Sequence, residues 1–157
     1  MQLWALLMAF AAAVAVQPSN SSLEQKAATH EYIVSATVLA ADSVVLVDSV
    51  EFKRQLANPG LIYEAGPTHY HLWHYRLVID EHLKGAALAD TVAIYSPIFG
   101  IEDRARLHAN KRYILFVDQA LDYDWLPVDE ALWLNSRSDA LGYSAAAEAN
   151  IKRLLEN

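Results

Sequence analysis

Three closely spaced histidines, His69, His71 and His74, are the residues of this chain with metal-ligand character. On an extended strand His69 and His71 share a face, so they could give two imidazoles to one zinc or copper ion, whereas His74 would point to the opposite face. A third ligand would have to come from another part of the chain, and the candidate donors are His30, His82 and His108. The alternative is that these rings lie at the mouth of a barrel, where one side packs and the other meets water.

A second candidate site is the aromatic pair Tyr123 and Trp125, which lies in the acidic stretch 118–130. Barrel domains that bind sugars or nucleic acids do so through loops and exposed aromatic rings. The two rings are therefore candidate ligand-binding residues for a sugar or a peptide, and the alternative is that they cover one end of the fold. The acidic side chains of this stretch follow no known calcium-loop spacing, so we expect a solvated loop.

The sequence contains no motif typical of a nucleophilic enzyme. It has no cysteine and no G-x-S-x-G motif. The adjacent Asp80 and Glu81 would point to opposite faces of a strand, so they cannot act as a carboxylate pair. We therefore predict a protein that is not an enzyme and that needs no cofactor, unless His69 and His71 hold zinc or copper.

The stretch 69–85 must position the histidines, and its side chains alternate as in a long strand. One face of this strand is apolar and consists of Trp73, Tyr75, Leu77 and Ile79. Strict alternation would also place the charged Glu81 in the core, so either the strand leaves the barrel near residue 80 or a bulge resets its phase. Gly85 then ends the strand, because glycine can adopt the positive φ of a tight turn.

Five further strands are predicted from β-branched and apolar runs. The runs 32–40 and 44–52 flank turn-forming residues and suggest a hairpin, followed by a long loop over residues 53–68. The other strands are expected at 91–97, at 111–118 and, as a short edge strand, at 131–135. Charged residues favour a short helical segment near residues 101–108. Ser144 can cap a C-terminal helix whose apolar stripe, expected to pack on the barrel, is Ala147, Ile151, Leu154 and Leu155.

The amino-terminal part of the chain predicts export. An uncharged apolar run at residues 3–16 is shorter than the about 20 residues of a membrane span, and small residues at 13 and 15 suit a cleavage site. We expect a signal peptide at residues 1–15, a flexible lead-in at 16–29 and a single domain at 30–157. The mature protein would be periplasmic or secreted, of bacterial type, with no stable membrane span.

The net charge of −7 and the absence of cysteine limit the partners and the means of stabilisation. An acidic surface repels phosphate backbones, and the basic clusters contain only two residues each, so nucleic acid is not an expected partner. Without disulfides, the domain must be stabilised by its hydrophobic core.

The order of these elements predicts a mainly β fold, a small five-stranded barrel of the OB type with a C-terminal helix. The runs LVIDEHLKG, TVAIYSP and KRYILFVD resemble the core of secreted OB-fold domains similar to the inhibitory domain of tissue inhibitors of metalloproteinases. This resemblance covers residues 75–118 and implies the fold and an extracytoplasmic setting. In those inhibitors a cysteine at the mature amino terminus chelates the protease zinc, and this chain has no cysteine to do so.

These observations together predict an exported, non-catalytic binding domain that recognises an unknown protein or cell-envelope ligand through its loops. Two alternatives remain open. One is a metal-binding periplasmic protein that uses His69 and His71, and the other is a protease inhibitor that acts through a cysteine-independent contact.

Overall fold

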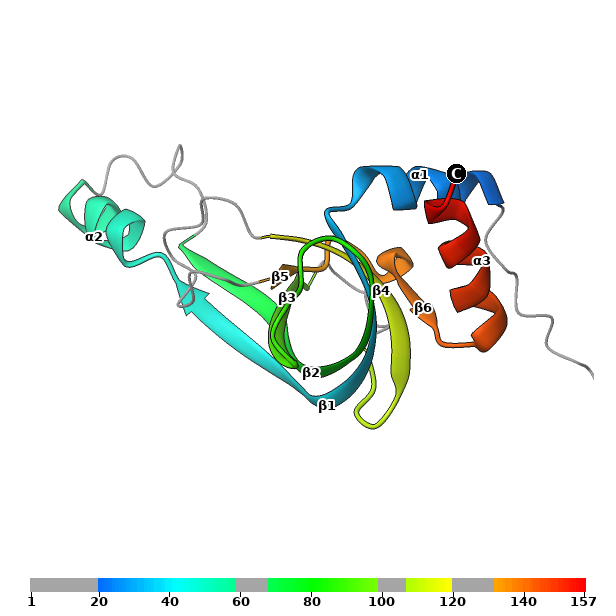
Figure 1. Ribbon diagram of the computed structural model, residues 1–157. Helices are drawn as coiled ribbons and strands as arrows, with labels where there is room; N and C mark the ends of the chain where they lie inside the picture. The colour runs from blue at the N-terminus through cyan, green and yellow to red at the C-terminus, as the bar shows by residue number, and fades with distance from the viewer. Residues whose placement is uncertain (1–19, 59–67, 99–106, 120–131) are drawn as a thin grey trace, which may run out of the picture.

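The computed structural model describes residues 20–58, 68–98, 107–119 and 132–157 (Figure 1). The helices in these ranges are α1 (Asn20–Thr29), α2 (Ser49–Ala57), α3 (Ala145–Leu155) and the short 3-10 helix η2 (Arg137–Asp139). The strands are β1 (Tyr32–Val47), β2 (His69–Lys84), β3 (Thr91–Pro97), β4 (Arg112–Gln119), β5 (Leu132–Trp133) and β6 (Ala140–Gly142). No helix in the described ranges is both long and apolar enough to cross a membrane.

The strands close into a ring, which confirms the prediction of a small five-stranded, OB-like barrel. The sheet order is β1-β2-β3-β5-β4-β6, and β1 also pairs with β4. Hydrogen bonds therefore pass around the ring through β1, β2, β3, β5 and β4. The sheet is mixed, because β3 and β5 run parallel while the other pairs are antiparallel.

The interior of the ring is filled by alternate side chains of its strands, as a closed sheet requires. The predicted apolar face of β2 lies in this core: Tyr75 and Leu77 are buried, and Trp73 and Ile79 pack against the cluster. The facing side chains of β1 and β4 include Val34, Ala36, Val38, Tyr113, Leu115 and Val117. The hydrophobic core predicted in place of disulfides is therefore present inside the barrel.

A bulge in β2 explains where Glu81 goes. Ser35 lies opposite Glu81 and the next residue, Ala36, lies opposite Ile79, so β2 has one extra residue at this point. The extra residue resets the alternation, which is the second of the two alternatives that the sequence left open. Glu81 consequently lies outside the barrel, where its carboxylate is 2.6 Å from Nζ of Lys152 on α3.

A second core lies between the outer face of the ring and helices α1 and α3. Ile33, Ile114 and Phe116 of the sheet pack there against Ile151 of α3. The predicted stripe of α3 is confirmed, because Ala147, Leu154 and Leu155 join the same cluster. The predicted cap is also present, since Oγ of Ser144 accepts a hydrogen bond from the main-chain N–H of Ala147 at 3.1 Å.

Helix α1 corrects the expectation of a flexible lead-in at residues 16–29. Residues 20–29 are helical, and Leu23 and Ala27, four positions apart on one face, are buried in the outer core. The polar composition of this segment predicts flexibility, but two apolar side chains on one helical face are enough to hold a short helix against the sheet.

Two further expectations about residues 32–68 are wrong. The turn expected at 41–43 does not exist, because β1 continues through these residues and pairs with β2 as far as Val47 opposite His69. The strand expected at 44–52 ends at Val47, and helix α2 begins at Ser49, since Asp48 accepts hydrogen bonds from the main-chain N–H groups of Val50 and Glu51. Part of the expected loop is therefore helical.

The turn at Gly85 has the positive φ angle that the sequence predicts, at 95°, and Asn110, before β4, also has a positive φ of 61°. The short strand expected at 131–135 is present as β5, but it is not an edge strand, because it pairs with both β3 and β4 and closes the ring. The helical segment expected near residues 101–108 lies mostly outside the described residues, which resume at Leu107.

Replacing Gly85 with alanine is expected to lower the free energy of unfolding by about 2 kcal/mol. A Cβ atom at this position would lie 2.6 Å from Cδ1 of Tyr32 and 2.7 Å from the carbonyl oxygen of Glu31, and φ is unfavourable for a side chain. Urea unfolding would measure the loss. The matched control is Gly142→Ala, where a Cβ meets nothing within 4 Å. Equal stabilities of the two variants would contradict this account.

Acid is expected to destabilise the protein partly through Glu148 of α3. A hydrogen bond from Lys152 at 3.0 Å, helped by Glu81 and by the charges of Lys152 and Arg112, outweighs desolvation and lowers the pKa of Glu148. The ionised form therefore stabilises the fold. That contribution is complete above the pKa of the unfolded chain, about 4.3, and is lost as the pH falls through the lower pKa of the folded state.

The variant Glu148→Gln should be less stable than the wild type near neutral pH, and the difference should shrink towards about pH 3. Urea unfolding over that range measures both effects. Glu51→Gln on α2 is the control, because α2 contains no buried residue and its unfolding need not unfold the barrel. An unchanged difference between wild type and Glu148→Gln at all pH values would refute the assignment.

Candidate functional site

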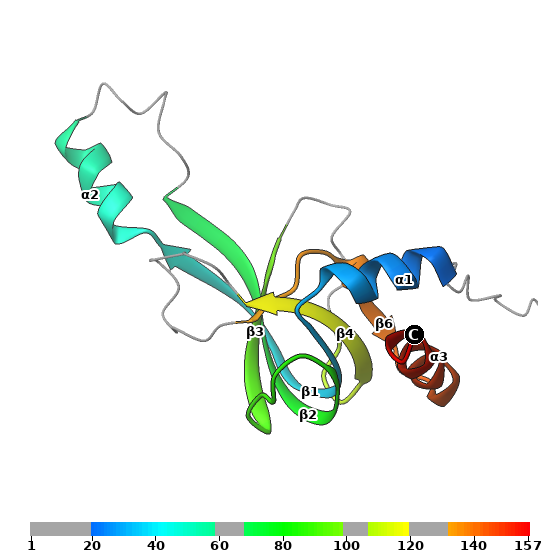
Figure 2. The same cartoon turned by 45° about the horizontal axis from the view of Figure 1, so that its top comes forward.

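Strands β1 and β2 extend together beyond the ring and carry helix α2 at their far end (Figures 1 and 2). We call residues 42–58 and 69–74 the arm. Within it, Val45 lies opposite His71 and Val47 opposite His69. One face of the arm is half-buried in a small cluster, which contains Leu72, Tyr95, Val44, Leu46 and Tyr70. This cluster stiffens the base of the arm.

The other face of the arm is exposed. Val45 and Val47 are 51% and 42% exposed, and the two histidines opposite them are exposed as well. The ring of Phe52, from α2, packs edge-on against His69 with the centroids 5.7 Å apart. Towards the ring of strands this face continues into Trp73, which stacks on the buried Tyr75. The arm therefore presents an apolar and imidazole surface that is continuous with the barrel interior.

Helix α2 adds apolar surface at the tip. It is held by its cap at Asp48 and by Arg54, whose guanidinium lies 2.6–2.7 Å from the Glu51 carboxylate. Hydrogen bonds from Arg54 and Gln55 lower the pKa of Glu51 to about 2. None of the residues of α2 is buried, although the helix is amphipathic, and Val50 and Leu56 are 74% and 65% exposed. An amphipathic helix with no core to cover has an unused apolar face.

The structure brings two of the three sequence-predicted histidines together. His69 and His71 share the exposed face of the arm, whereas His74 lies on the opposite face and packs on Tyr95 with the ring centroids 4.9 Å apart. Across the described part of the chain, no group of three histidine, aspartate or glutamate side chains is placed to hold a metal ion. The aromatic candidates Tyr123 and Trp125 lie outside the described residues.

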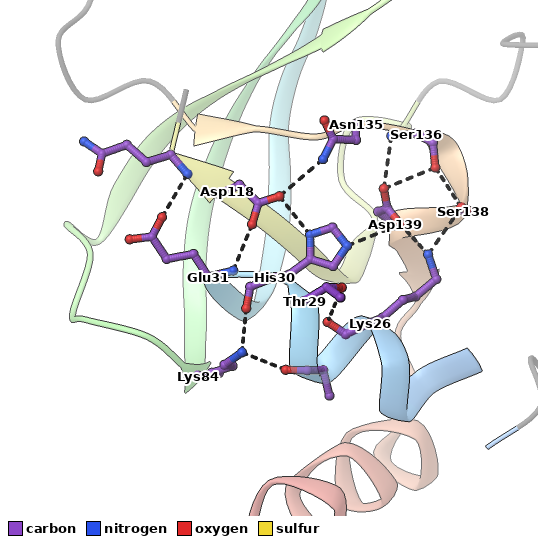
Figure 3. Close-up of polar contacts among 12 residues, drawn as sticks. Lys26, Thr29, His30, Glu31, Lys84, Asp118, Asn135, Ser136, Ser138 and Asp139 are labelled. Atoms are coloured by element: carbon purple, nitrogen blue, oxygen red, sulfur yellow. Dashed lines mark hydrogen bonds and ion pairs between the residues drawn. The ribbon is translucent and has the colours of Figure 1, made fainter. Parts of the chain in front are cut away.

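A buried polar network surrounds His30, where α1 meets β4 and η2 (Figure 3). The His30 side chain is 11% exposed. Its Nδ1 donates to Oδ2 of Asp118 at 3.0 Å, and its Nε2 lies 3.7 Å from Oδ1 of Asp139. Because an ionised carboxylate only accepts hydrogen bonds, Nδ1 must carry a proton in this contact. The imidazole ring also packs against Phe116 in the outer core.

Both carboxylates of the network have further donors. Asp118 accepts hydrogen bonds from the main-chain N–H of Glu31 at 2.8 Å and from the side chain of Asn135 at 3.2 Å. Asp139, whose side chain is 8% exposed, forms an ion pair with Lys26 and accepts the main-chain N–H of Ser136 at 3.2 Å. These contacts satisfy the charges that the fold buries.

The carboxyl end of α1, next to this network, is held by Lys84 at the end of β2. Nζ of Lys84 donates to the carbonyl oxygens of Ala27 and His30 at 2.7 and 2.6 Å, which occupies carbonyl groups that a helix end leaves unpaired. The network around His30 therefore acts as a latch that fixes α1 to the barrel. We call the contacts among Lys26, His30, Asp118 and Asp139 the latch.

Comparison of the chain with protein-family models and with curated protein sequences finds no match.

The sequence interpretation missed both features. The sequence indicates His30 only as a candidate metal donor, because Asp118 lies 88 positions away and no local pattern connects the two residues. The arm was hidden by the turn-forming composition of residues 41–43. One signal could have revealed the arm. Ser43, Val45 and Val47 alternate along one run, and His69 and His71 alternate along the other, and two such runs can pair as a two-stranded ribbon.

Proposed function

We propose that the chain is an exported, non-catalytic binding domain whose arm docks a protein partner. One observation carries the proposal. The large apolar side chains that the described part of the chain leaves exposed all lie between residues 39 and 56, and they are Leu39, Val45, Val47, Val50, Phe52 and Leu56. All of them except Leu39 belong to the arm. Apolar side chains that are scattered singly over a surface are ordinary, whereas a group of them on one protruding element marks an interaction site.

The non-catalytic part of the proposal is supported by the latch. His30 is the buried histidine of the described residues, and its ring nitrogens face two carboxylates that are themselves engaged. A histidine held in this way has a clear structural role. Export rests on the sequence, and N-terminal sequencing of the mature protein should read Val16 first.

Site-specific photocrosslinking in the source organism tests the docking surface. A benzophenone side chain is introduced at position 50 or 56 of α2, and at Glu156, beyond α3, as the control. We expect one saturable protein adduct at the arm positions and none at the control. Excess wild-type protein should compete for the adduct, whereas the variant Val50→Ser/Phe52→Ser/Leu56→Ser should not.

The triple variant is a fair competitor because α2 has no buried residue, so its stability should stay within about 0.5 kcal/mol per site of the wild type. Identical adducts at the arm and at Glu156, or none at either, would exclude the arm as a docking surface.

The metal-binding alternative is supported by the placement of His69 and His71 on one exposed face. A calorimetric zinc or copper titration compares the wild type with His69→Ala/His71→Ala. Metal binding that is lost in the variant would select this function. Protease inhibition is supported by the resemblance to the inhibitory domains and by the barrel, and a panel of metalloproteases left active by the protein would remove it.

A further inference from the structure

The outer edge of β1 is open over its second half. β4 pairs with β1 from Tyr32 to Thr37, and the last main-chain contacts on that side join Val38 to Lys111 and Asn110 at 2.9 and 2.7 Å. Beyond this point the described strands pair with β1 on the β2 side only. We call residues 39–47 the open edge. Its outward-facing N–H and C=O groups have no strand partner among the described residues.

The open edge lacks the devices that usually protect such a strand. Proteins blunt edges with lysine, proline, bulges or short strands. The open edge is LAADSVVLV, which contains no lysine, arginine or proline, and its one bulge is at Leu39, where β1 leaves β4. From Ala40 to Val47 the register with β2 continues without another shift. This segment is therefore a regular template for a further strand.

We infer that the open edge binds an extended segment of the partner protein, which adds to the sheet as a strand beside β1. The inference rests on the proposed function and specifies how the partner binds. Main-chain hydrogen bonds would supply much of the affinity, and the side chains on the two faces would supply the specificity.

The side chains along the open edge define the chemistry of the partner segment. Val45 and Val47 are exposed on one face, and Val44 and Leu46 are half-buried on the other, so the centre of the added strand should be β-branched and uncharged. Asp42 is exposed within the edge, so a basic residue of the partner should lie beside it. A second copy of this chain fits less well, because each copy carries a net charge of −7.

Synthetic peptides test this inference on the full mature chain. The probe is the acetylated peptide amide Lys-Val-Thr-Val-Thr-Val-Lys, and its charge-reversed counterpart has glutamate at both ends. We expect the basic peptide to bind at least about tenfold more tightly than the acidic one, by fluorescence anisotropy. Hydrogen exchange should show slower exchange of amides within residues 39–47 when the basic peptide is bound.

Three controls separate strand addition from other contacts. A basic peptide that is N-methylated at every residue between its two lysines should not bind, because neither of its edges then offers N–H donors to β1. Asp42→Lys should reverse the preference between the basic and acidic peptides, with thermal unfolding confirming that the variant is folded. Glu156→Gln, at the end of α3 and outside both the arm and the open edge, should leave peptide binding unchanged.

Several outcomes would overturn the inference. They are no binding of the basic peptide at about 1 mM, binding that survives N-methylation, or protection of other strands in place of the open edge. Dimerisation of the chain that protects the same amides would show that a second copy occupies the edge. The proposed function is tested separately by photocrosslinking. A crosslinked partner together with no peptide binding would support the docking surface but would reject strand addition.

Discussion

Phe116→Ala is expected to lower the free energy of unfolding by about 3–5 kcal/mol. Phe116 is completely buried on the outer face of β4, in the core that joins the ring to α1 and α3. Its ring also contacts the imidazole of His30, so truncation would leave a cavity beneath the latch. Since a domain of this size is stable by roughly 5–15 kcal/mol, this one change removes a large share of the total.

Urea unfolding followed by fluorescence measures the loss for Phe116→Ala. The matched control is Val45→Ala, because Val45 is also an apolar strand residue but is 51% exposed on the arm. The control should change the stability by less than about 0.5 kcal/mol. If Phe116→Ala cost no more than Val45→Ala, the outer core would not be a source of stability.

Asp139→Ala is expected to cost about 3 kcal/mol, the second largest effect. Its side chain is 8% exposed and is the partner of Lys26, whose own side chain is only 18% exposed. Removing the carboxylate leaves a largely buried ammonium group without its partner, and it also takes an acceptor from Ser136. The cost is at the lower end for buried pairs, because the lysine can still reach water.

The loss for Asp139→Ala should be accompanied by faster hydrogen exchange in α1, since the latch holds that helix. Ser138→Ala serves as the control, because Ser138 is exposed and contacts Lys26 at a longer distance of 3.3 Å. Unchanged exchange in α1 would show that the helix is held by its apolar contacts alone.

The barrel could be predicted from the sequence because its signals are local. The two-residue alternation around Tyr75 and Leu77, the turn at Gly85 and the stripe of α3 each depend on neighbouring residues. For Glu81 the sequence left two alternatives, a strand that leaves the barrel near residue 80 or a bulge. The register of β2 with β1 shows the bulge.

The candidate site could not be predicted in the same way, because it depends on pairing between distant segments. Residues 41–43 have the composition of a turn, yet β2 supplies a continuous partner for β1 and keeps it extended. The latch joins residues from α1, β4 and η2, and only the folded chain brings them together. The histidines at 69 and 71 were placed correctly on one face because that relation is local.

The bulge at Leu39 divides β1 into two halves whose side chains meet different physical demands. Up to Val38 every second side chain must fill the barrel, so few substitutions there would be tolerated. Beyond Leu39 the strand needs only to remain extended beside β2, and its exposed side chains contribute little to folding. Descendants of this fold could therefore vary the arm to change ligand while inheriting an unaltered scaffold, as variable loops diversify on a constant framework.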